Sequence, residues 1–149
     1  MPVEGEVMIA NRDKGLRHMW KAAVTAHEIT AIDFVNPEAA LSLYETTPRN
    51  YRLFLTGDSF KSLRGLELVK RVRSIATESE APTRIIVMTN RDLVLTNGAK
   101  AQMDRFADVV YNGWQSVEVI TAELSFMKGE IDLEGLAQRH QEINRRLRG

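Results

Sequence analysis

The sequence contains no cysteine. This absence excludes disulfide bonds, thiolate zinc sites and cysteine nucleophiles, and it is compatible with a reducing compartment. No stretch approaches the roughly 20 apolar residues that a membrane span requires. Residues 1–13 carry acids before a short apolar run, so they lack the basic start and the long apolar core of a signal peptide. We therefore expect a cytoplasmic protein with no membrane partner.

An excess of charge of either sign is also missing, because 20 basic residues balance 20 acidic ones. A neutral chain has no overall field that attracts nucleic acid, so we do not expect nucleic acid as a partner. The three histidines are scattered and lack the spacing of metal ligands. Neither a G-x-S-x-G motif nor a glycine-rich loop after the first apolar run is present. We predict that the protein is not an enzyme.

What the sequence does contain is a regular alternation of short apolar runs and segments with helical spacing. Apolar runs of this length are typical of strands buried on both faces of a parallel sheet. Alternation with helices predicts an open α/β sheet, with the flavodoxin-like strand order 2-1-3-4-5. Function in such sheets gathers at the carboxyl ends of the strands. The predicted strands are residues 6–10, 28–34, 51–55, 84–89 and 107–111.

The C-terminal segment that follows Gly129 has a helical seam of its own. Its members repeat at steps of three and four residues, which is the spacing of one helix face. We predict a single α/β domain at 1–129 and a helical extension at 130–149. The seam either folds back onto its own domain or binds a partner or a second copy of the chain. Its residues are Leu133, Leu136, His140, Ile143 and Leu147.

Three stretches carry a resemblance to a known family: GLELVKRVRS at 65–74, RIIVMTNRD at 84–92 and ADVVY at 107–111. With these stretches, residues 5–128 resemble the receiver domain of response regulators. The resemblance implies a CheY-like fold and transfer of a phosphoryl group from a histidine kinase to an aspartate. Such a site needs an acceptor carboxylate, two acids for Mg²⁺, a hydroxyl and a lysine, because the transferred group is densely negative.

The resemblance places different residues at most of these positions. The acidic pair that should follow the first strand corresponds to Asn11 and Arg12, with Asp13 one place beyond. Arg12 puts a cation where the divalent metal would be held, which opposes binding. The acceptor aspartate corresponds to Gly57, and Asp58 matches only if the loop has lost one residue.

At the remaining strands only one position of the family's site keeps its residue type. Thr89 matches the hydroxyl at the end of the fourth strand, whereas Gly113 replaces the lysine and Trp114 the proline that follows it. Val110 falls on the aromatic switch position, and Tyr111 lies one place away. We therefore predict a degenerate receiver, or pseudo-receiver, in which Asp58 is a turn or capping acid.

The preferred hypothesis is a phosphorylation-independent signalling module that binds a protein partner in a bacterial two-component-type pathway, without metal or cofactor. Its predicted surface combines the fourth helix, the fifth strand and the fifth helix with the extension, and it includes Tyr111, Trp114 and the seam. A homodimer through the C-terminal surface is one form of this hypothesis. A further hypothesis is that Arg12 pairs with Asp58 or Asp13 and locks the vacated site.

Two alternatives remain open from the sequence. The first is a working phospho-acceptor in which Asp58 is the nucleophile, Asp13 and Asn11 help hold Mg²⁺, and Thr89 binds the phosphoryl group. The second is a nucleotide-effector-binding module, because guanidinium groups suit phosphates. Its basic residues would be the arginines of the tail: Arg139, Arg145, Arg146 and Arg148.

Overall fold

The computed structural model describes residues 6–57, 65–89, 97–112 and 116–148. In chain order its elements are β1 (Val7–Ala10), α1 (Lys14–Thr25), β2 (Ala31–Phe34), α2 (Pro37–Thr46), the 3₁₀ helix η1 (Pro48–Asn50), β3 (Leu53–Thr56), α3 (Gly65–Ser79), β4 (Arg84–Thr89), α4 (Asn97–Phe106), β5 (Val109–Asn112), α5 (Ser116–Met127) and α6 (Leu133–Arg148).

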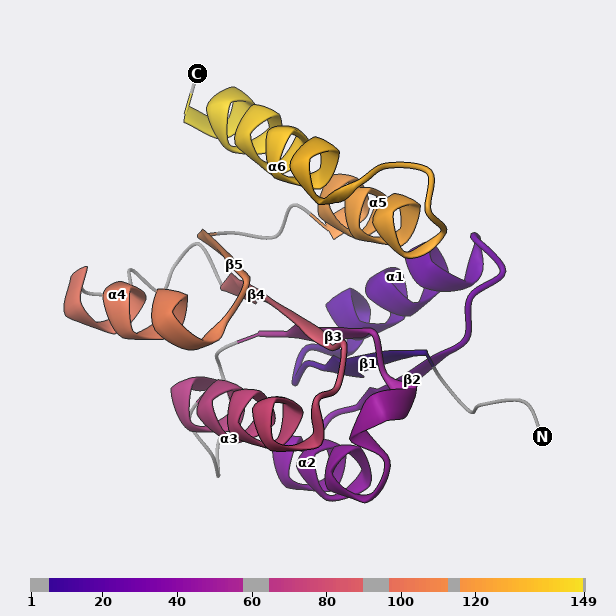
Figure 1. The fold of residues 1–149 in the computed structure, drawn as a ribbon, viewed down its shortest axis with the longest axis vertical. Helices are drawn as coiled ribbons and strands as arrows, with labels where there is room; N and C mark the ends of the chain where they lie inside the picture. Colours follow the sequence, from indigo (N-terminus) through magenta and orange to yellow (C-terminus); the bar gives the residue numbers. More distant parts are fainter. Residues whose placement is uncertain (1–5, 58–64, 90–96, 113–115, 149) are drawn as a thin grey trace.

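The five strands form one parallel sheet in the order β2-β1-β3-β4-β5 (Figure 1). This order confirms the prediction of a flavodoxin-like α/β fold. The second strand is shorter than predicted and begins at Ala31 rather than at residue 28. Glu28 has a φ of 60°, and its N–H bonds to the carbonyl of Thr25, so this part of the chain forms the turn that ends α1.

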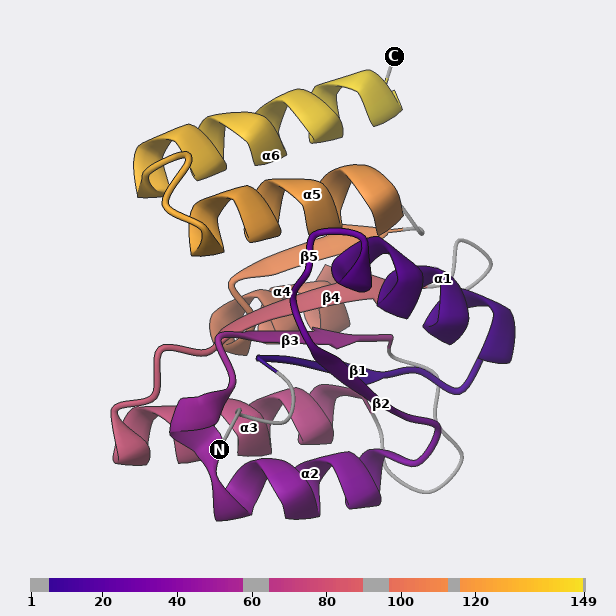
Figure 2. The same cartoon turned by 90° about the vertical axis from the view of Figure 1, so that its right-hand side faces the viewer.

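Successive strand residues point to opposite faces of the sheet, and each face is covered by its own helices. Met8 and Phe54 contribute to the core beneath α2, α3 and α4. Ile9 and Leu55 contribute to the core beneath α1 and α5. Figure 2 shows these layers edge on, with the sheet between them. This arrangement explains the apolar runs, because both faces of the inner strands are buried.

The extension forms a further layer outside α5 (Figures 1 and 2). Ile143 of α6 is 4% exposed and belongs to the same apolar core as residues of α1 and α5. Helix α6 therefore packs within its own chain, which is one of the two arrangements that the seam left open. Among the described residues, none of the helices combines the length and the apolar character that crossing a bilayer requires.

Candidate functional site

The carboxyl ends of β1 and β3 lie side by side at the edge of the sheet. Ala10 pairs with Thr56, and the N–H of Gly57 donates to the carbonyl of Ala10 at 3.2 Å. A Cβ atom added to Gly57 would lie 3.7 Å from Nδ2 of Asn11, which is an ordinary van der Waals contact. The structure thus brings together two positions that the resemblance assigned to one site, those of the first acid and of the acceptor.

Asn11 is buried at this edge, with 6% of its surface exposed. Its Oδ1 accepts a hydrogen bond from the N–H of Asp13 at 2.8 Å. Its Nδ2 is buried and has no hydrogen-bond partner among the described residues. An unsatisfied buried donor costs about 1–3 kcal/mol. The position that an acid occupies in the family therefore presents a donor nitrogen beside Gly57.

Asp13 has a structural role in the same segment. Its carboxylate accepts from the N–H of Leu16 at 3.0 Å, so Asp13 is the N-cap of α1. Arg12 is exposed, and within the described residues it forms no ion pair with Asp13. This part of the proposed arginine lock is therefore wrong, because the carboxylate is turned toward the helix backbone. Asp58, the other proposed partner, lies outside the described residues.

A different arginine stands at the end of β1. Nη1 of Arg17 donates to the carbonyl of Asn11 at 3.0 Å, and its Nε donates to Asp33 at 3.0 Å. Lys21 pairs with the same carboxylate at 2.9 Å. Burial raises the pKa of Asp33, but the hydrogen bonds and charges of Lys21 and Arg17 outweigh burial and hold the pKa below its usual value. This ion-pair cluster joins α1 to β2 and offers no free carboxylate.

The described residues at this edge do not fit Mg²⁺. The ion prefers several oxygen ligands, with carboxylates among them. Here Asn11 places a neutral amide beside Gly57, Asp13 caps a helix and Asp33 is neutralised by two cations. Across the described parts of the chain, no group of three or more acidic or histidine side chains is placed to hold a metal.

Thr89 lies at the end of β4, as the resemblance implied, and is fully buried. Its hydroxyl donates to the carbonyl of Tyr111 at 3.2 Å. Thr56, at the end of β3, donates its hydroxyl to the carbonyl of Gly57 at 2.8 Å. Both hydroxyl protons are therefore used by the backbone. Gly113 and Trp114, the remaining predicted site positions, lie outside the described residues.

Replacing Asp13 with alanine is expected to lower the free energy of unfolding by about 1 kcal/mol, because one N-terminal N–H of α1 loses its acceptor. Asp13→Asn should remain within a few tenths of a kcal/mol of the wild type, since asparagine caps helices equally well. Urea unfolding with and without Mg²⁺ measures both effects. A loss in Asp13→Asn that appears only when Mg²⁺ is present would instead identify Asp13 as a metal ligand.

A second polar cluster, which the sequence did not reveal, joins α6 to the rest of the domain. The hydroxyl of Tyr111 lies 2.5 Å from Nδ1 of His140, and Nε2 of His140 lies 2.6 Å from Glu123. Arg84 donates to both oxygens of Glu123, at 2.6 and 3.1 Å. The cluster thus links β5, α6, α5 and β4. We call these four residues the α6 anchor.

The electrostatics of the α6 anchor support an ionised carboxylate. Burial raises the pKa of Glu123, but hydrogen bonds and positive charge from His140 and Arg84 lower it below its usual value. Nε2 of His140 is therefore the donor to Glu123. Burial raises the pKa of Tyr111, and the charge of Glu123 raises it further, so the phenol keeps its proton.

Tyr111, His140 and Glu123 follow the order hydroxyl, imidazole and carboxylate that serine hydrolases use. Their exposed fractions are only 1%, 6% and 1%, so the three side chains cannot meet a substrate. The three residues therefore have a structural role, which is to hold α6 against α5 and β5. The signal that could have revealed it is Glu123, which lies between Ala122 and Leu124 in the largely apolar helix α5.

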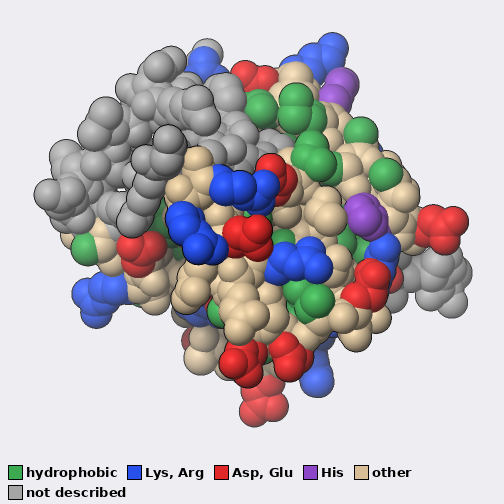
Figure 3. Space-filling model, turned by 90° about the horizontal axis from the view of Figure 1, so that it is seen from above, with side chains coloured by type: hydrophobic (Ala, Val, Ile, Leu, Met, Phe, Trp, Pro, Cys, Tyr) green, Lys and Arg blue, Asp and Glu red, His purple; other side chains and the backbone are tan. Residues whose placement is uncertain are grey.

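Most of the predicted interaction surface is used within the chain. Tyr111, Leu136, His140 and Ile143 are buried, because they pack α6 against α5 and β5. Only Leu133 is exposed, at 58%, and the side chain of Leu147 lies outside the described set. Figure 3 views the molecule from the α6 side and shows Lys and Arg side chains next to Asp and Glu across this face. A partner that approaches from this side therefore meets charged groups and not the seam.

Comparisons with known proteins identify the architecture. No protein-family model matches the sequence, and no curated protein is significantly similar to it. Among solved structures, the Francisella response regulator 1452 receiver domain has a TM-score of 0.64 at 20% identity, over 84% of this chain and 98% of that chain. A CheY-like response regulator receiver domain protein of Methanospirillum hungatei has a TM-score of 0.66 at 14% identity, over 91% and 96%.

A third similar structure is the receiver domain of a Saccharomyces cerevisiae response regulator, crystallised with a histidine phosphotransfer signalling protein. Its TM-score is 0.65 at 13% identity, over 80% of this chain and 85% of that chain. Similarity at these identities concerns the fold. The chain has the CheY-like fold of response regulator receiver domains, as the sequence predicted.

Proposed function

We propose that this protein is a signalling module of the two-component type that acts by binding a protein partner and does not depend on phosphorylation. The proposal depends on one observation, that Gly57 and Asn11 lie next to each other at the strand ends. Gly57 has no side chain that could be phosphorylated, and Asn11 offers it a buried nitrogen in place of a metal-binding carboxylate. The receiver fold is retained around a site whose described residues do not suit phosphoryl transfer.

The surrounding contacts support this proposal. A working receiver needs acids that are free to bind Mg²⁺ and a hydroxyl that is free to meet the phosphoryl group. Asp13 caps α1, and the hydroxyl of Thr89 donates to the backbone of Tyr111. Each of these residues thus has a structural partner within the domain, and we infer that the protein has no catalytic activity of its own.

Without phosphoryl transfer, we infer that the domain acts by binding another protein. One structurally similar receiver domain was crystallised with a phosphotransfer signalling protein, which supports a protein partner here as well. We infer that binding occurs in the cytoplasm and involves neither nucleic acid nor membrane. The balanced charge of the chain is consistent with this, because no overall basic field is available.

A titration with Mg²⁺ and beryllofluoride, a mimic of the aspartyl phosphate, tests the absence of phosphotransfer. Amide NMR shifts of Gly57, Asp58 and Thr89 are the readout, and we expect them to stay unchanged while the spectrum remains that of a folded protein. Asp58→Asn is the control variant. Saturable shifts in the wild type that vanish in Asp58→Asn would overturn the proposal and establish Asp58 as an acceptor.

A further inference from the structure

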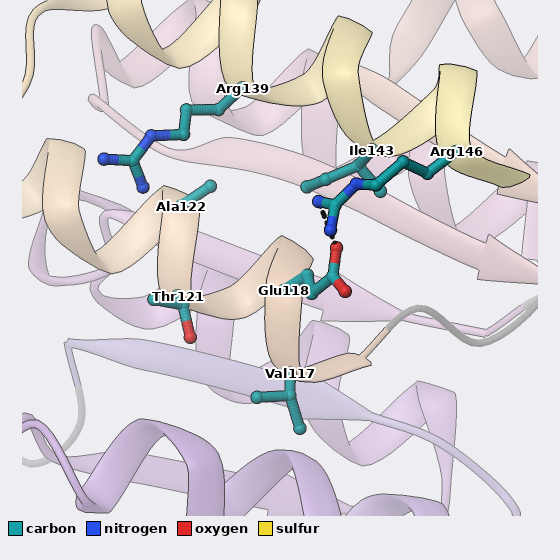
Figure 4. Close-up of a pocket in the computed structure, with 7 residues that line it drawn as sticks. All are labelled: Val117, Glu118, Thr121, Ala122, Arg139, Ile143 and Arg146. Atoms are coloured by element: carbon teal, nitrogen blue, oxygen red, sulfur yellow. Dashed lines mark hydrogen bonds and ion pairs between the residues drawn. The ribbon is translucent and has the colours of Figure 1, made fainter.

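A groove of about 320 Å³ runs between α5 and α6 (Figure 4). Helix α6 contributes Arg139, Ile143 and Arg146, which follow one another at steps of four and three residues and so share one helix face. In Figure 4 both arginines extend from α6 toward α5, with Ile143 between them. Seven residues of helix rise separate their Cα atoms by roughly 10 Å. The groove therefore has a cation at each end and an aliphatic side chain between them.

Arg139 and Arg146 differ in whether they form an ion pair. Arg146 pairs with Glu118 of α5 at 2.6 Å, and the side chains of the pair are 57% and 55% exposed. Arg139 is exposed and forms no ion pair within the described parts of the chain. The ion pair between Glu118 and Arg146 shows that a carboxylate can bind an arginine in this groove. Arg139 is the matching cation, and no carboxylate of the described residues forms an ion pair with it.

The rest of the lining is small and aliphatic. Ala122 and Ile143 are buried at 1% and 4% exposure, while Val117 at the rim is 58% exposed. None of the described residues that line the groove is aromatic, so these residues offer a nucleotide base no stacking surface. The volume is near the lower limit of small-ligand pockets, which is enough for one or two side chains.

The second half of α6 carries an excess of positive charge, which suits an acidic ligand. Residues 139–148 contain four arginines and one glutamate, although the chain as a whole is neutral. Electrostatic complementarity of this kind selects partners and speeds their association. The buried α6 anchor holds α6 against α5, so the two walls of the groove are fixed relative to each other.

We propose that the α5–α6 groove binds an acidic peptide segment of a partner protein, with a carboxylate on Arg139 and a neighbouring aliphatic side chain against Val117 and Ile143. This inference rests on the proposed function, because it gives the partner a place to bind and a chemistry. A second carboxylate of the partner competes with Glu118 for Arg146. The site is separate from the strand ends, where Asn11 and Gly57 lie.

The test begins with selection of a random linear peptide library on the full-length protein. We expect the enriched peptides to carry Asp or Glu beside Leu, Ile or Val. Arg139→Gln should weaken their binding by roughly two- to fivefold, which is the range of an exposed ion pair. Glu118→Gln should strengthen binding by a similar factor, because it frees Arg146. Damage to the fold would not produce opposite changes in the two variants.

Controls separate this inference from the proposed function. Arg139→Lys keeps the charge and should retain most of the binding, while circular dichroism verifies that each variant is folded. Enriched peptides that bind Arg139→Gln and Glu118→Gln as tightly as the wild type would overturn the proposal that the groove is the binding site. The proposed function, a module that binds a protein partner, would still stand. A failure to enrich acidic peptides would also overturn the groove.

A nucleotide would produce a different pattern. ATP or AMP shifting the amides of Thr121 and Ile143 in an Arg139-dependent manner, without any acidic peptide being enriched, would assign the groove to a nucleotide effector and overturn the peptide proposal. A beryllofluoride response at Gly57 and Thr89, by contrast, would overturn the proposal that the protein acts without phosphorylation. The peptide experiments would then test the groove proposal independently.

Discussion

Replacing Glu123 with alanine is expected to lower the free energy of unfolding by about 3–5 kcal/mol, because removal of one member of a buried ion pair leaves Arg84 with only a 4.0 Å ion-pair contact to Asp108. Arg84 would lose both of its short hydrogen bonds, and His140 would lose the acceptor for Nε2. A small domain is stable by only about 5–15 kcal/mol. Urea unfolding monitored by circular dichroism measures the effect.

Glu118→Ala is the matched control for this prediction. Glu118 lies on the same helix and pairs with Arg146, but both side chains are more than half exposed. An exposed pair contributes about 0–1 kcal/mol. Equal losses in Glu118→Ala and Glu123→Ala would contradict the view that burial makes the α6 anchor important.

The same carboxylate has a characteristic pH dependence. The folded pKa of Glu123 lies below the ordinary value of 4.5, so its contribution is fully present above that pH and is lost as the pH falls through the folded pKa. Glu123→Gln resembles the protonated acid and carries no such dependence. The stability difference between wild type and Glu123→Gln should therefore narrow below about pH 4.5. A gap that widens as the pH falls below 4.5 would contradict an ionised Glu123.

Deletion of residues 130–149 is expected to reduce stability by several kcal/mol. Leu136 and Ile143 are almost fully buried, and each such side chain contributes about 1.5–3 kcal/mol. Tyr111 and Glu123 would in addition lose their contacts with His140. We expect residues 1–129 alone to unfold at a much lower urea concentration, with new exposure of the α5 surface detectable by a hydrophobic dye.

Two variants make the deletion interpretable. Leu133→Ala alters an exposed seam residue and should change stability little, whereas Ile143→Ala should cost about 2–5 kcal/mol because it leaves a cavity. A truncated protein as stable as the full chain would mean that α6 is a separable extension, and its seam would then be available to a partner.

Much of the strand-end site could be read from the sequence. The resemblance to receiver domains placed Asn11 and Gly57 in one site, and adjacent parallel strands bring their carboxyl ends to one edge. The structure confirms that the two residues are neighbours. The roles of their neighbours could not be read in this way. Asp13 is one residue from a predicted metal position, yet its carboxylate caps a helix, and Arg17 rather than Arg12 contacts the end of β1.

The seam of α6 illustrates the same limit. Its spacing of three and four residues predicts a helix with one apolar face, which the structure confirms at Leu133–Arg148. Spacing says nothing about what covers that face, because a neighbouring helix of the same chain and a partner's helix offer the same apolar contacts. In the folded chain α5 covers the apolar face of α6. His140, which the spacing placed on that face, is a polar member of the buried α6 anchor.

Local pattern thus determined which segments are strands and helices, because helix and strand formation depends on residues close together in the chain. The alternation of these segments predicted the strand order by precedent, and the resemblance to receiver domains predicted the loss of family side chains from the sheet edge. Tertiary structure alone decided the partners of Glu123, which lie 39 residues away at Arg84 and 17 away at His140. It also decided that Arg139 and Arg146 border one groove with Glu118. Pairing across such separations depends on how the helices pack, and helix packing is a property of the folded chain.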